Sequence, residues 1–246
     1  MTMTDIQVKE KFVKVKDFKL YAKVFGNKKT KPTVVMDAGY GDYSKAWKDI
    51  APEIAEFTEV VLYDRAGLGN SEKSSAPRTS DHMVDELKEM LTNMHIQLPY
   101  LLVGHSCGGV NLRLFATEYP KEVSGLILVD STPEEYKERF LPTMSVDFQK
   151  AYKEQFVYEG NYDEFMESLK LLKKTRKQLD IPLIVISAGK KAHYSPNSQE
   201  LWNNMQKELL TLSSNSQYIA AENSAHYIQY DEPWVVVNAI KSLIFN

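Results

Sequence analysis

The feature that most constrains this chain is a Gly-His-Ser-Cys-Gly sequence at residues 104–108. The four residues before it, 100–103, are apolar or aromatic, as a strand covered on both faces requires. The residues after it, 110–119, follow a helical pattern that ends at Pro120. A G-x-S-x-G sequence between a strand and a helix is typical of a sharp turn that presents a nucleophilic serine.

Each residue type in this turn has a physical reason. Ser106 is expected at a strained apex, with its hydroxyl above the edge of the sheet. Gly104 and Gly108 have no side chains, so the strand and the helix can approach closely. The N–H of Cys107 opens the helix and is expected to face the place where an oxyanion would form. We predict Ser106 as the nucleophile and consider Cys107 a poor alternative, because Ser106 holds the central position.

Composition places the chain among ordinary globular proteins. Its 246 residues suit one domain, 1–246, with a sizeable core, and 43% are hydrophobic and 26% charged. A net charge of −3 gives no indication of nucleic-acid binding, and no apolar run approaches membrane-spanning length. With one cysteine no intramolecular disulfide can form, and residues 1–16 lack the apolar core of a signal peptide. We therefore expect a soluble, cytoplasmic protein.

Short β-rich segments alternate with helical patterns along the chain. Residues 11–15 and 20–25 predict an antiparallel hairpin at one edge of a sheet. Further strands are predicted at residues 33–37, 60–64, 100–103, 123–129, 181–186 and 217–221, and helices at 44–56, from a cap at 79–81, and at 233–245. The alternation indicates an α/β fold with a mostly parallel, eight-stranded sheet flanked by helices.

The block between the strands at 123–129 and 181–186 has a different character. It contains three helical stretches, near residues 134–140, 146–157 and 162–179, with many large apolar side chains and no strand. Ligands in open α/β sheets bind at the carboxyl ends of the strands. We therefore predict that residues 132–180 form a small helical cap after strand six. The alternative is that these side chains only pack the insertion against the body.

A serine hydroxyl needs a base, and the chain has five histidines. His105 lies inside the turn, and we expect its side chain to point elsewhere. His82 and His95 flank an amphipathic helix, and His193 lies in a polar loop. His226 follows the last strand through a flexible turn that could bring it over the sheet's carboxyl end. We predict His226 as the base.

Three motifs together resemble the α/β-hydrolase fold superfamily. They are Gly-His-Ser-Cys-Gly at 104–108, Tyr-Asp-Arg-Ala-Gly-Leu-Gly-Asn-Ser at 63–71, and Ser-Ala-His-Tyr-Ile-Gln-Tyr-Asp-Glu-Pro at 224–233. The resemblance covers nearly the whole chain and implies the order nucleophile, acid, histidine. It implies a serine hydrolase with a helical cap and an eight-stranded sheet.

The resemblance leaves the acid less clear than the serine and the histidine. In most members the acid follows the seventh strand, but residues 187–196 contain no Asp or Glu. Some members place it at the end of strand six, where this chain has Asp130, and we predict Asp130 as the acid that orients His226. Asp130 could instead cap the turn that follows it. Asp64, in a motif that usually anchors its own turn with Arg65, is the runner-up, and Glu200 is a third candidate.

The resemblance also locates the second oxyanion donor in the loop after strand three. Related enzymes carry a His-Gly pair there, whereas this chain has Ala38-Gly39, and Tyr40 follows as the expected donor beside Cys107. No metal is implied, because His and Cys show no ligand spacing. No cofactor is implied either, because the glycines of residues 67–69 lack the dinucleotide-binding context.

The predicted function is hydrolysis of a carboxylic ester or a similar carbonyl substrate through an acyl-enzyme. A small-molecule substrate with an apolar acyl group suits the apolar cap, and neither a nucleic-acid partner nor a membrane span is expected. Within enzymes, C–C hydrolase, aminopeptidase, thioesterase, lactonase and acyltransferase activities stay open. Outside enzymes, a ligand-binding or receptor protein can keep the same fold and an intact triad.

Overall fold

The computed structural model describes residues 6–26 and 32–245, and eight strands in this part of the chain form one sheet. The strands are β1 (Val8–Val15), β2 (Phe18–Phe25), β3 (Thr33–Asp37), β4 (Val60–Tyr63), β5 (Tyr100–His105), β6 (Val123–Val129), β7 (Leu183–Ala188) and β8 (Ser216–Ala221). Their order across the sheet is β1-β2-β4-β3-β5-β6-β7-β8. β1 and β2 pair antiparallel at one edge, β2 pairs antiparallel with β4, and the other pairs are parallel. The predicted hairpin and mostly parallel sheet are confirmed.

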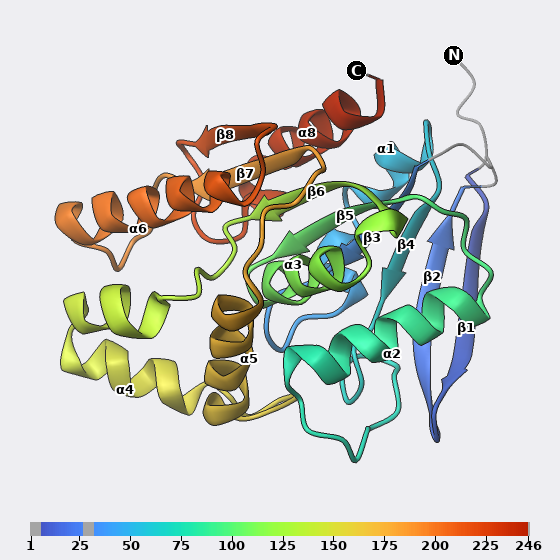
Figure 1. Ribbon diagram of the computed structural model, residues 1–246, viewed down its shortest axis with the longest axis horizontal. Helices are drawn as coiled ribbons and strands as arrows, with labels where there is room; N and C mark the ends of the chain where they lie inside the picture. The colour runs from blue at the N-terminus through green and yellow to red at the C-terminus, as the bar shows by residue number, and fades with distance from the viewer. Residues whose placement is uncertain (1–5, 27–31, 246) are drawn as a thin grey trace.

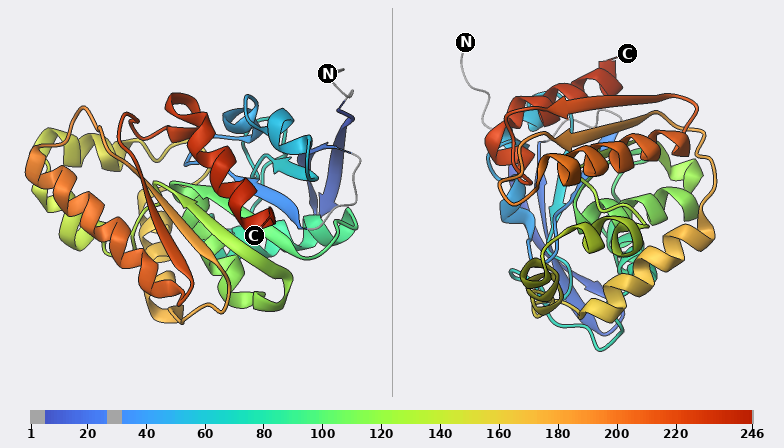
Figure 2. Two further views of the ribbon diagram at one scale, coloured as in Figure 1. Left: turned by 90° about the horizontal axis from the view of Figure 1, so that it is seen from above. Right: turned by 90° about the vertical axis from the view of Figure 1, so that its left-hand side faces the viewer.

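Helices cover both faces of this sheet (Figures 1 and 2). They are α1 (Ala51–Ala55), α2 (Ser80–Asn93), α3 (Cys107–Glu118), α4 (Val146–Glu154), α5 (Tyr162–Thr175), α6 (Pro196–Glu208), α7 (Ile228–Asp231) and α8 (Pro233–Phe245). Side chains of α2, α3, α5 and α6 share one buried cluster with one face of the sheet, and those of α1 and α8 share a second cluster with the other face.

The pleat of β3 shows how the strand sequence produces two cores. Val34 and Met36 join the cluster under α1 and α8, whereas Val35 between them joins the cluster under α2 and α3. All three are fully buried. Successive side chains of a strand point to opposite faces, so a strand covered on both sides must be apolar at every position.

Two helical predictions need correction. The predicted helix at 44–56 is broken into a 3₁₀ turn, Ser44–Trp47, and α1, because Pro52 has no N–H to donate back to the preceding turn. Helix α6 was not predicted at all. Its start carries a clear signal, since the Ser195 hydroxyl accepts a hydrogen bond from the N–H of Ser198 at 3.1 Å and Pro196 occupies the first turn.

The chain between β6 and β7 consists of helical elements, turns and one isolated β-bridge, between Leu179 and Ser213. A π-helical turn (Tyr136–Phe140) and a 3₁₀ turn (Leu141–Thr143) precede α4 and α5. Helix α5 packs against α3 and α2, and α4 lies beyond the arrowheads of β5 and β6 (Figure 1). This segment therefore occupies the end of the sheet at which parallel strands present their carboxyl termini.

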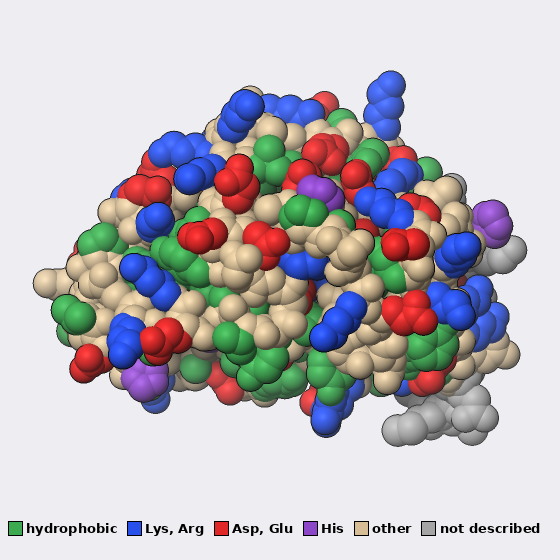
Figure 3. Space-filling model, turned by 90° about the horizontal axis from the view of Figure 1, so that it is seen from below, with side chains coloured by type: hydrophobic (Ala, Val, Ile, Leu, Met, Phe, Trp, Pro, Cys, Tyr) green, Lys and Arg blue, Asp and Glu red, His purple; other side chains and the backbone are tan. Residues whose placement is uncertain are grey.

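The surface seen from below carries interspersed acidic and basic side chains with small apolar areas between them (Figure 3). Within residues 6–26 and 32–245, no helix combines the length and the apolar character that crossing a bilayer requires.

Candidate active site

Ser106 stands at a strained turn between β5 and α3. Its backbone has φ 52° and ψ −117°, a conformation that L-residues rarely adopt, and its N–H donates to the carbonyl of Val129 at 3.0 Å. A Cβ added to Gly108 would lie 2.4 Å from the carbonyl oxygen of Asp37, and one added to Gly104 would lie 2.5 Å from the Cα of Gly109. The glycines are therefore required for the strand, helix and neighbouring loop to meet at this turn.

Asp130 and His226 are joined by a short hydrogen bond although they are far apart in sequence. Asp130 follows β6 directly, and its Oδ2 lies 2.6 Å from Nδ1 of His226 in the loop between β8 and α7. Asp130 is fully buried, whereas the His226 side chain is 38% exposed. The structure brings these two predicted residues together with the histidine's Nδ1 toward the carboxylate.

The Asp130 carboxylate is surrounded by donors. Its Oδ1 accepts from the indole N–H of Trp202 at 2.7 Å and from the N–H of Ala188 at 3.1 Å. Burial alone would raise the pKa of the Asp130 carboxyl, but the Lys191 ammonium and the hydrogen bond from His226 hold that pKa well below its usual value. Asp130 is therefore ionised at neutral pH and accepts a hydrogen bond from Nδ1 of His226.

One residue that contacts the Asp130 carboxylate, Lys191, was not predicted from the sequence. It lies in the loop after β7, and its Nζ is 2.5 Å from the same Asp130 Oδ2 that contacts His226. Only 7% of the side chain is exposed. The prediction treated residues 187–196 only as a loop without an acid, and nothing in the sequence shows that a lysine there would meet the carboxylate at the end of β6.

His105 supports His226 from below. Its Nε2 donates to the carbonyl oxygen of His226 at 2.9 Å, and the two rings lie 4.6 Å apart. Burial lowers the pKa of His105 to about 3, so its ring is neutral. The hydrogen bond of the His105 ring therefore goes to the loop that carries His226, and none is formed with Ser106.

Ser106 and His226 line one cavity. In the described part of the chain, the Ser106 hydroxyl forms no hydrogen bond within normal geometry, with His226 or with another group. A ligand-free site commonly has a longer serine–histidine distance, which shortens when a substrate is bound.

Several backbone N–H groups at this cavity form no hydrogen bond within residues 6–26 and 32–245, and two of them are the predicted oxyanion donors. They belong to Cys107, at the start of α3, and to Tyr40, in the loop after β3, and both residues line the cavity. The Tyr40 hydroxyl accepts from the N–H of Tyr158 at 2.9 Å and donates to the carbonyl of Gly160 at 2.7 Å. Tyr40 is therefore held by the segment between α4 and α5.

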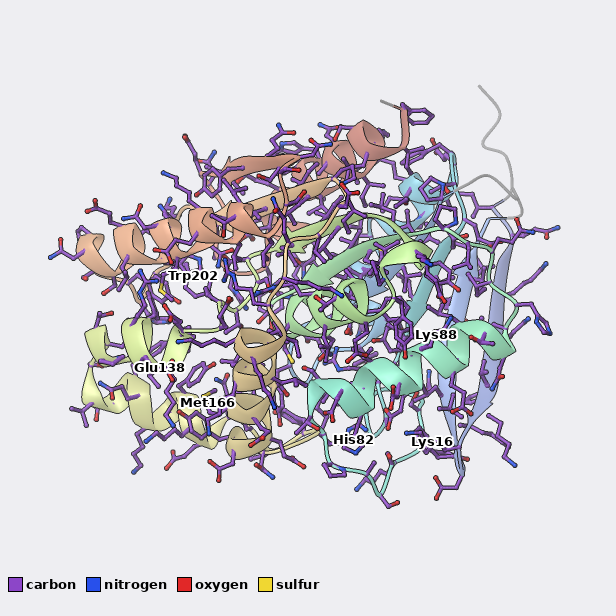
Figure 4. The ribbon with its side chains drawn as sticks, viewed as in Figure 1. Lys16, His82, Lys88, Glu138, Met166 and Trp202 are labelled. Atoms are coloured by element: carbon purple, nitrogen blue, oxygen red, sulfur yellow. The ribbon has the colours of Figure 1, made fainter. Side chains whose placement is uncertain are left out.

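The cavity has a volume of about 390 Å³ and an aromatic lining. Most of the lining rings come from the segment between β6 and β7 and from α6 with the loop before it: Tyr136, Phe148, Tyr152, Phe156, Phe165, Tyr194 and Trp202. Trp202 lies on the side of α6 that faces the segment after β6 (Figure 4), and its ring contacts those of Tyr136 and Phe140. The cavity thus offers a large apolar surface beside Ser106.

The runner-up carboxylates lie in other environments. Asp64 is buried, and its two oxygens accept the N–H groups of Ser44 at 2.9 Å and Asn70 at 2.8 Å, so it anchors the turn after β4. It does so without Arg65, which instead pairs with Asp37 and Glu159. Glu200 is exposed on α6.

None of the exposed or partly exposed histidines other than His226 contacts Asp130 in the described part of the chain. His82 contacts Thr79 and Asp81 at the start of α2, and His95 is exposed after its end. His193 is exposed at the cavity wall. The described residues include no group of three or more His, Cys, Asp or Glu side chains that could hold a metal ion.

A family model for the α/β hydrolase fold matches residues 32–158, which includes the turn at Ser106. This chain belongs to the α/β-hydrolase fold family. A curated relative, the uncharacterized protein YqjL of Bacillus subtilis (strain 168), is 37% identical over 210 residues, which are 85% of this chain and 81% of that protein.

Solved structures of α/β hydrolases share the fold at low sequence identity. A putative lipase from Acinetobacter baumannii AYE has a TM-score of 0.73 at 19% identity, over 96% of this chain and 91% of the lipase. The enol-lactonase from Burkholderia xenovorans LB400 has a TM-score of 0.72 at 15% identity, over 96% of this chain and 100% of the lactonase. These α/β hydrolases support the sheet order and the helical layers described above.

Proposed function

We propose that the protein is a serine hydrolase that acts on a carboxylic ester or a similar carbonyl substrate. In this proposal Ser106 is the nucleophile, His226 the general base and Asp130 the acid, in the chain order that the fold uses. The N–H groups of Tyr40 and Cys107 form the oxyanion hole. The observation that carries the proposal is the 2.6 Å contact of buried Asp130 with His226, at the cavity that Ser106 lines.

The mechanism follows from these positions. Ser106 attacks the carbonyl carbon while Nε2 of His226 takes the hydroxyl proton, and Asp130 stays ionised and stabilises the imidazolium. The negative oxygen of the tetrahedral intermediate accepts the N–H groups of Tyr40 and Cys107. His226 then protonates the leaving alcohol. Water, activated by the same histidine, finally releases the acid and restores Ser106.

The segment 132–180 serves in this proposal as a cap within a single domain. It contributes Tyr136, Phe148, Tyr152 and Phe156 to the cavity wall, whereas Ser106 and His226 come from the sheet's carboxyl end. A cavity of about 390 Å³ with aromatic walls suits a small to medium apolar acyl group. The substrate is therefore expected to be an uncharged ester with a short aliphatic or aromatic acyl chain.

Hydrolysis of a p-nitrophenyl ester chain-length series tests the proposal. We expect the wild type to turn over esters with an optimum at short to medium chains. Ser106→Ala and His226→Ala should each lower kcat at least about 10³-fold, and Asp130→Asn about 10³- to 10⁴-fold. A serine-directed fluorophosphonate should label the wild type and not Ser106→Ala.

Matched controls separate catalytic from structural effects. His193→Ala removes an exposed histidine at the same cavity and Asp64→Asn alters the runner-up acid; both should retain activity per folded molecule. Asp130→Asn leaves the buried Lys191 without its carboxylate, so circular dichroism must show that the variant is folded. Full activity in Asp130→Asn would exclude it as the acid. A wild type inert to both esters and fluorophosphonate would favour a ligand-binding protein instead.

A further inference from the structure

Lys191 and His226 compete for one oxygen atom. Nζ of Lys191 lies 2.5 Å and Nδ1 of His226 lies 2.6 Å from Oδ2 of Asp130. The two nitrogens are therefore within about 5 Å of each other, a separation at which like charges repel appreciably in a buried site. Every proton that His226 accepts places a second cation beside the Lys191 ammonium.

The surroundings of Lys191 hold its ammonium in place. Nζ lies 3.5 Å from the ring centroid of Trp202 and 4.9 Å from that of Tyr194, so aromatic faces cover it. The indole N–H of Trp202 donates to the other oxygen of Asp130. Lysine, carboxylate and indole thus form one packed unit that joins the end of β6, the loop after β7 and α6.

We propose that Lys191 is a positioning residue that fixes Asp130 and limits how strongly Asp130 favours the protonated form of His226. The proposal rests on the triad proposed above. A buried carboxylate favours the imidazolium over the neutral imidazole, and a second cation on the same carboxylate oxygen opposes that preference. A general base is effective only where its neutral form is available at the working pH. The lysine offsets part of the carboxylate's charge.

The other titratable groups that face His226 are carboxyl groups, a neutral imidazole and a phenol, so none of them repels the imidazolium as Lys191 does. Asp130 lies at Nδ1, and buried His105, which is neutral, lies under the ring. Asp42 also lines the cavity, and burial raises the pKa of its carboxyl. The Tyr227 ring, 5.6 Å from that of His226, carries a phenol whose pKa burial raises to about 12. Among the described residues that line the cavity, only Lys191 is a lysine or arginine.

The pH dependence of kcat/KM for an uncharged p-nitrophenyl ester tests the proposal. Lys191→Met removes the charge at similar length, and Lys191→Gln removes it but keeps an N–H donor. In both variants the midpoint of the acidic limb should move to higher pH by about one unit, because the imidazolium loses its repelling neighbour. Lys191→Arg keeps the charge and should keep the wild-type midpoint. Lys190→Met, at the adjacent exposed lysine, is the matched control and should match the wild type.

Two results would overturn the proposal. An equal loss of activity at every pH, with the midpoint unchanged in folded Lys191→Met and Lys191→Gln, would mean that the lysine only fills space. A raised KM for esters with a carboxylate in the acyl group, again with an unchanged midpoint for the uncharged ester, would mean that Lys191 binds a substrate anion.

A second measurement does not depend on catalysis. The imidazole C–H resonances of His226, assigned by their absence in His226→Ala, can be titrated by NMR in the wild type and in Lys191→Gln. A midpoint that is higher in the variant supports the inference even if no ester is hydrolysed, in which case only the proposed function fails. Equal midpoints contradict the inference whether or not the protein is an esterase.

Discussion

Asp130, the proposed triad acid, follows β6 but lies beside the end of β7. Strands β6 and β7 are parallel neighbours, and the N–H of Asp130 donates to the carbonyl of Ile186 at 2.7 Å. The backbone of Asp130 has φ 44°, which costs a non-glycine residue about 1 kcal/mol or more. The N–H of Ala188 then holds the side chain against the end of β7. A carboxylate that follows β6 thus arrives beside the end of β7.

Cys107 permits a test at the same scale. It is 3% exposed, and burial raises the pKa of its thiol well above the usual value. Iodoacetamide at pH 8 should therefore leave the native protein unmodified and its ester hydrolysis unchanged. Mass spectrometry should find one carbamidomethyl group per chain only after unfolding, since the sequence has one cysteine. Rapid labelling of the native protein would contradict the buried position.

At the scale of elements, a buried arginine connects the loop after β3 with the segment between α4 and α5. Arg65 donates to the carbonyls of Ala38 at 2.7 Å and Gly39 at 2.6 Å, and it pairs with Asp37. Its Nε and Nη2 each lie 2.6 Å from an oxygen of Glu159. The loop that carries Tyr40 is therefore fastened to the proposed cap from two sides, by this pair and by the tyrosine hydroxyl.

Glu159→Gln tests that connection. The Glu159 side chain is fully buried and also accepts the N–H of Gly41 at 3.0 Å, so the variant leaves the arginine with reduced charge compensation. We expect a loss of about 2–3 kcal/mol in the free energy of unfolding, measured in urea, and a lower kcat from a less ordered Tyr40. Glu154→Gln, which breaks only an exposed pair with Lys150 at 3.8 Å, should cost about 0.5 kcal/mol or less. Equal stability of the two variants would refute the connection.

The sequence predicted those elements whose signals are local. The turn at Ser106 could be predicted because its glycines, strand and helix are contiguous. His226 could be proposed as the base because, of the five histidines, it alone follows the last predicted strand. Helix α6 also has a local signal, Ser195-Pro196, although no helix was predicted there. The contacts of Lys191 could not be predicted in this way. They depend on the pairing of β6 with β7 and on a tryptophan from α6, three segments that meet only in the folded sheet.

At the scale of the whole molecule, a buried ion pair joins the segment after β6 to the body. Glu134 contacts Arg113 of α3 at 2.9 Å and also pairs with Arg176, which follows α5. Burial alone would raise the pKa of Glu134, but Arg113 and then Arg176 lower it to about 2. The segment that supplies much of the cavity wall is thus held to the sheet layer by a carboxylate with a depressed pKa.

Lowering the pH should therefore reduce the free energy of unfolding of the wild type more than that of a variant without this carboxylate. A group whose pKa is lower in the folded state stabilises the fold above its unfolded pKa, near 4.5, and this contribution is lost as the pH falls toward 2. The wild type should exceed Glu134→Gln in free energy of unfolding by about 3 kcal/mol at pH 7, and the difference should shrink below pH 4.5. Chemical denaturation at several pH values measures it, with exposed Glu167→Gln as the control. A difference that is constant with pH would contradict the assignment.

The position of Arg65 also affects the order in which parts of the molecule unfold. Its partner Glu159 is 94 residues away and lies next to Val157 and Tyr158, which are 72% and 69% exposed. Short exposed connections open at lower free energy than central strands. Opening this connection releases Tyr40 while β3, β5 and β6 stay paired, so the loop that carries the proposed oxyanion donor Tyr40 loses its support before the sheet unfolds. The proposed ester hydrolysis should therefore be lost at a lower denaturant concentration than the circular dichroism signal of the sheet. Activity would then be a more sensitive measure than circular dichroism of whether a preparation is fully folded.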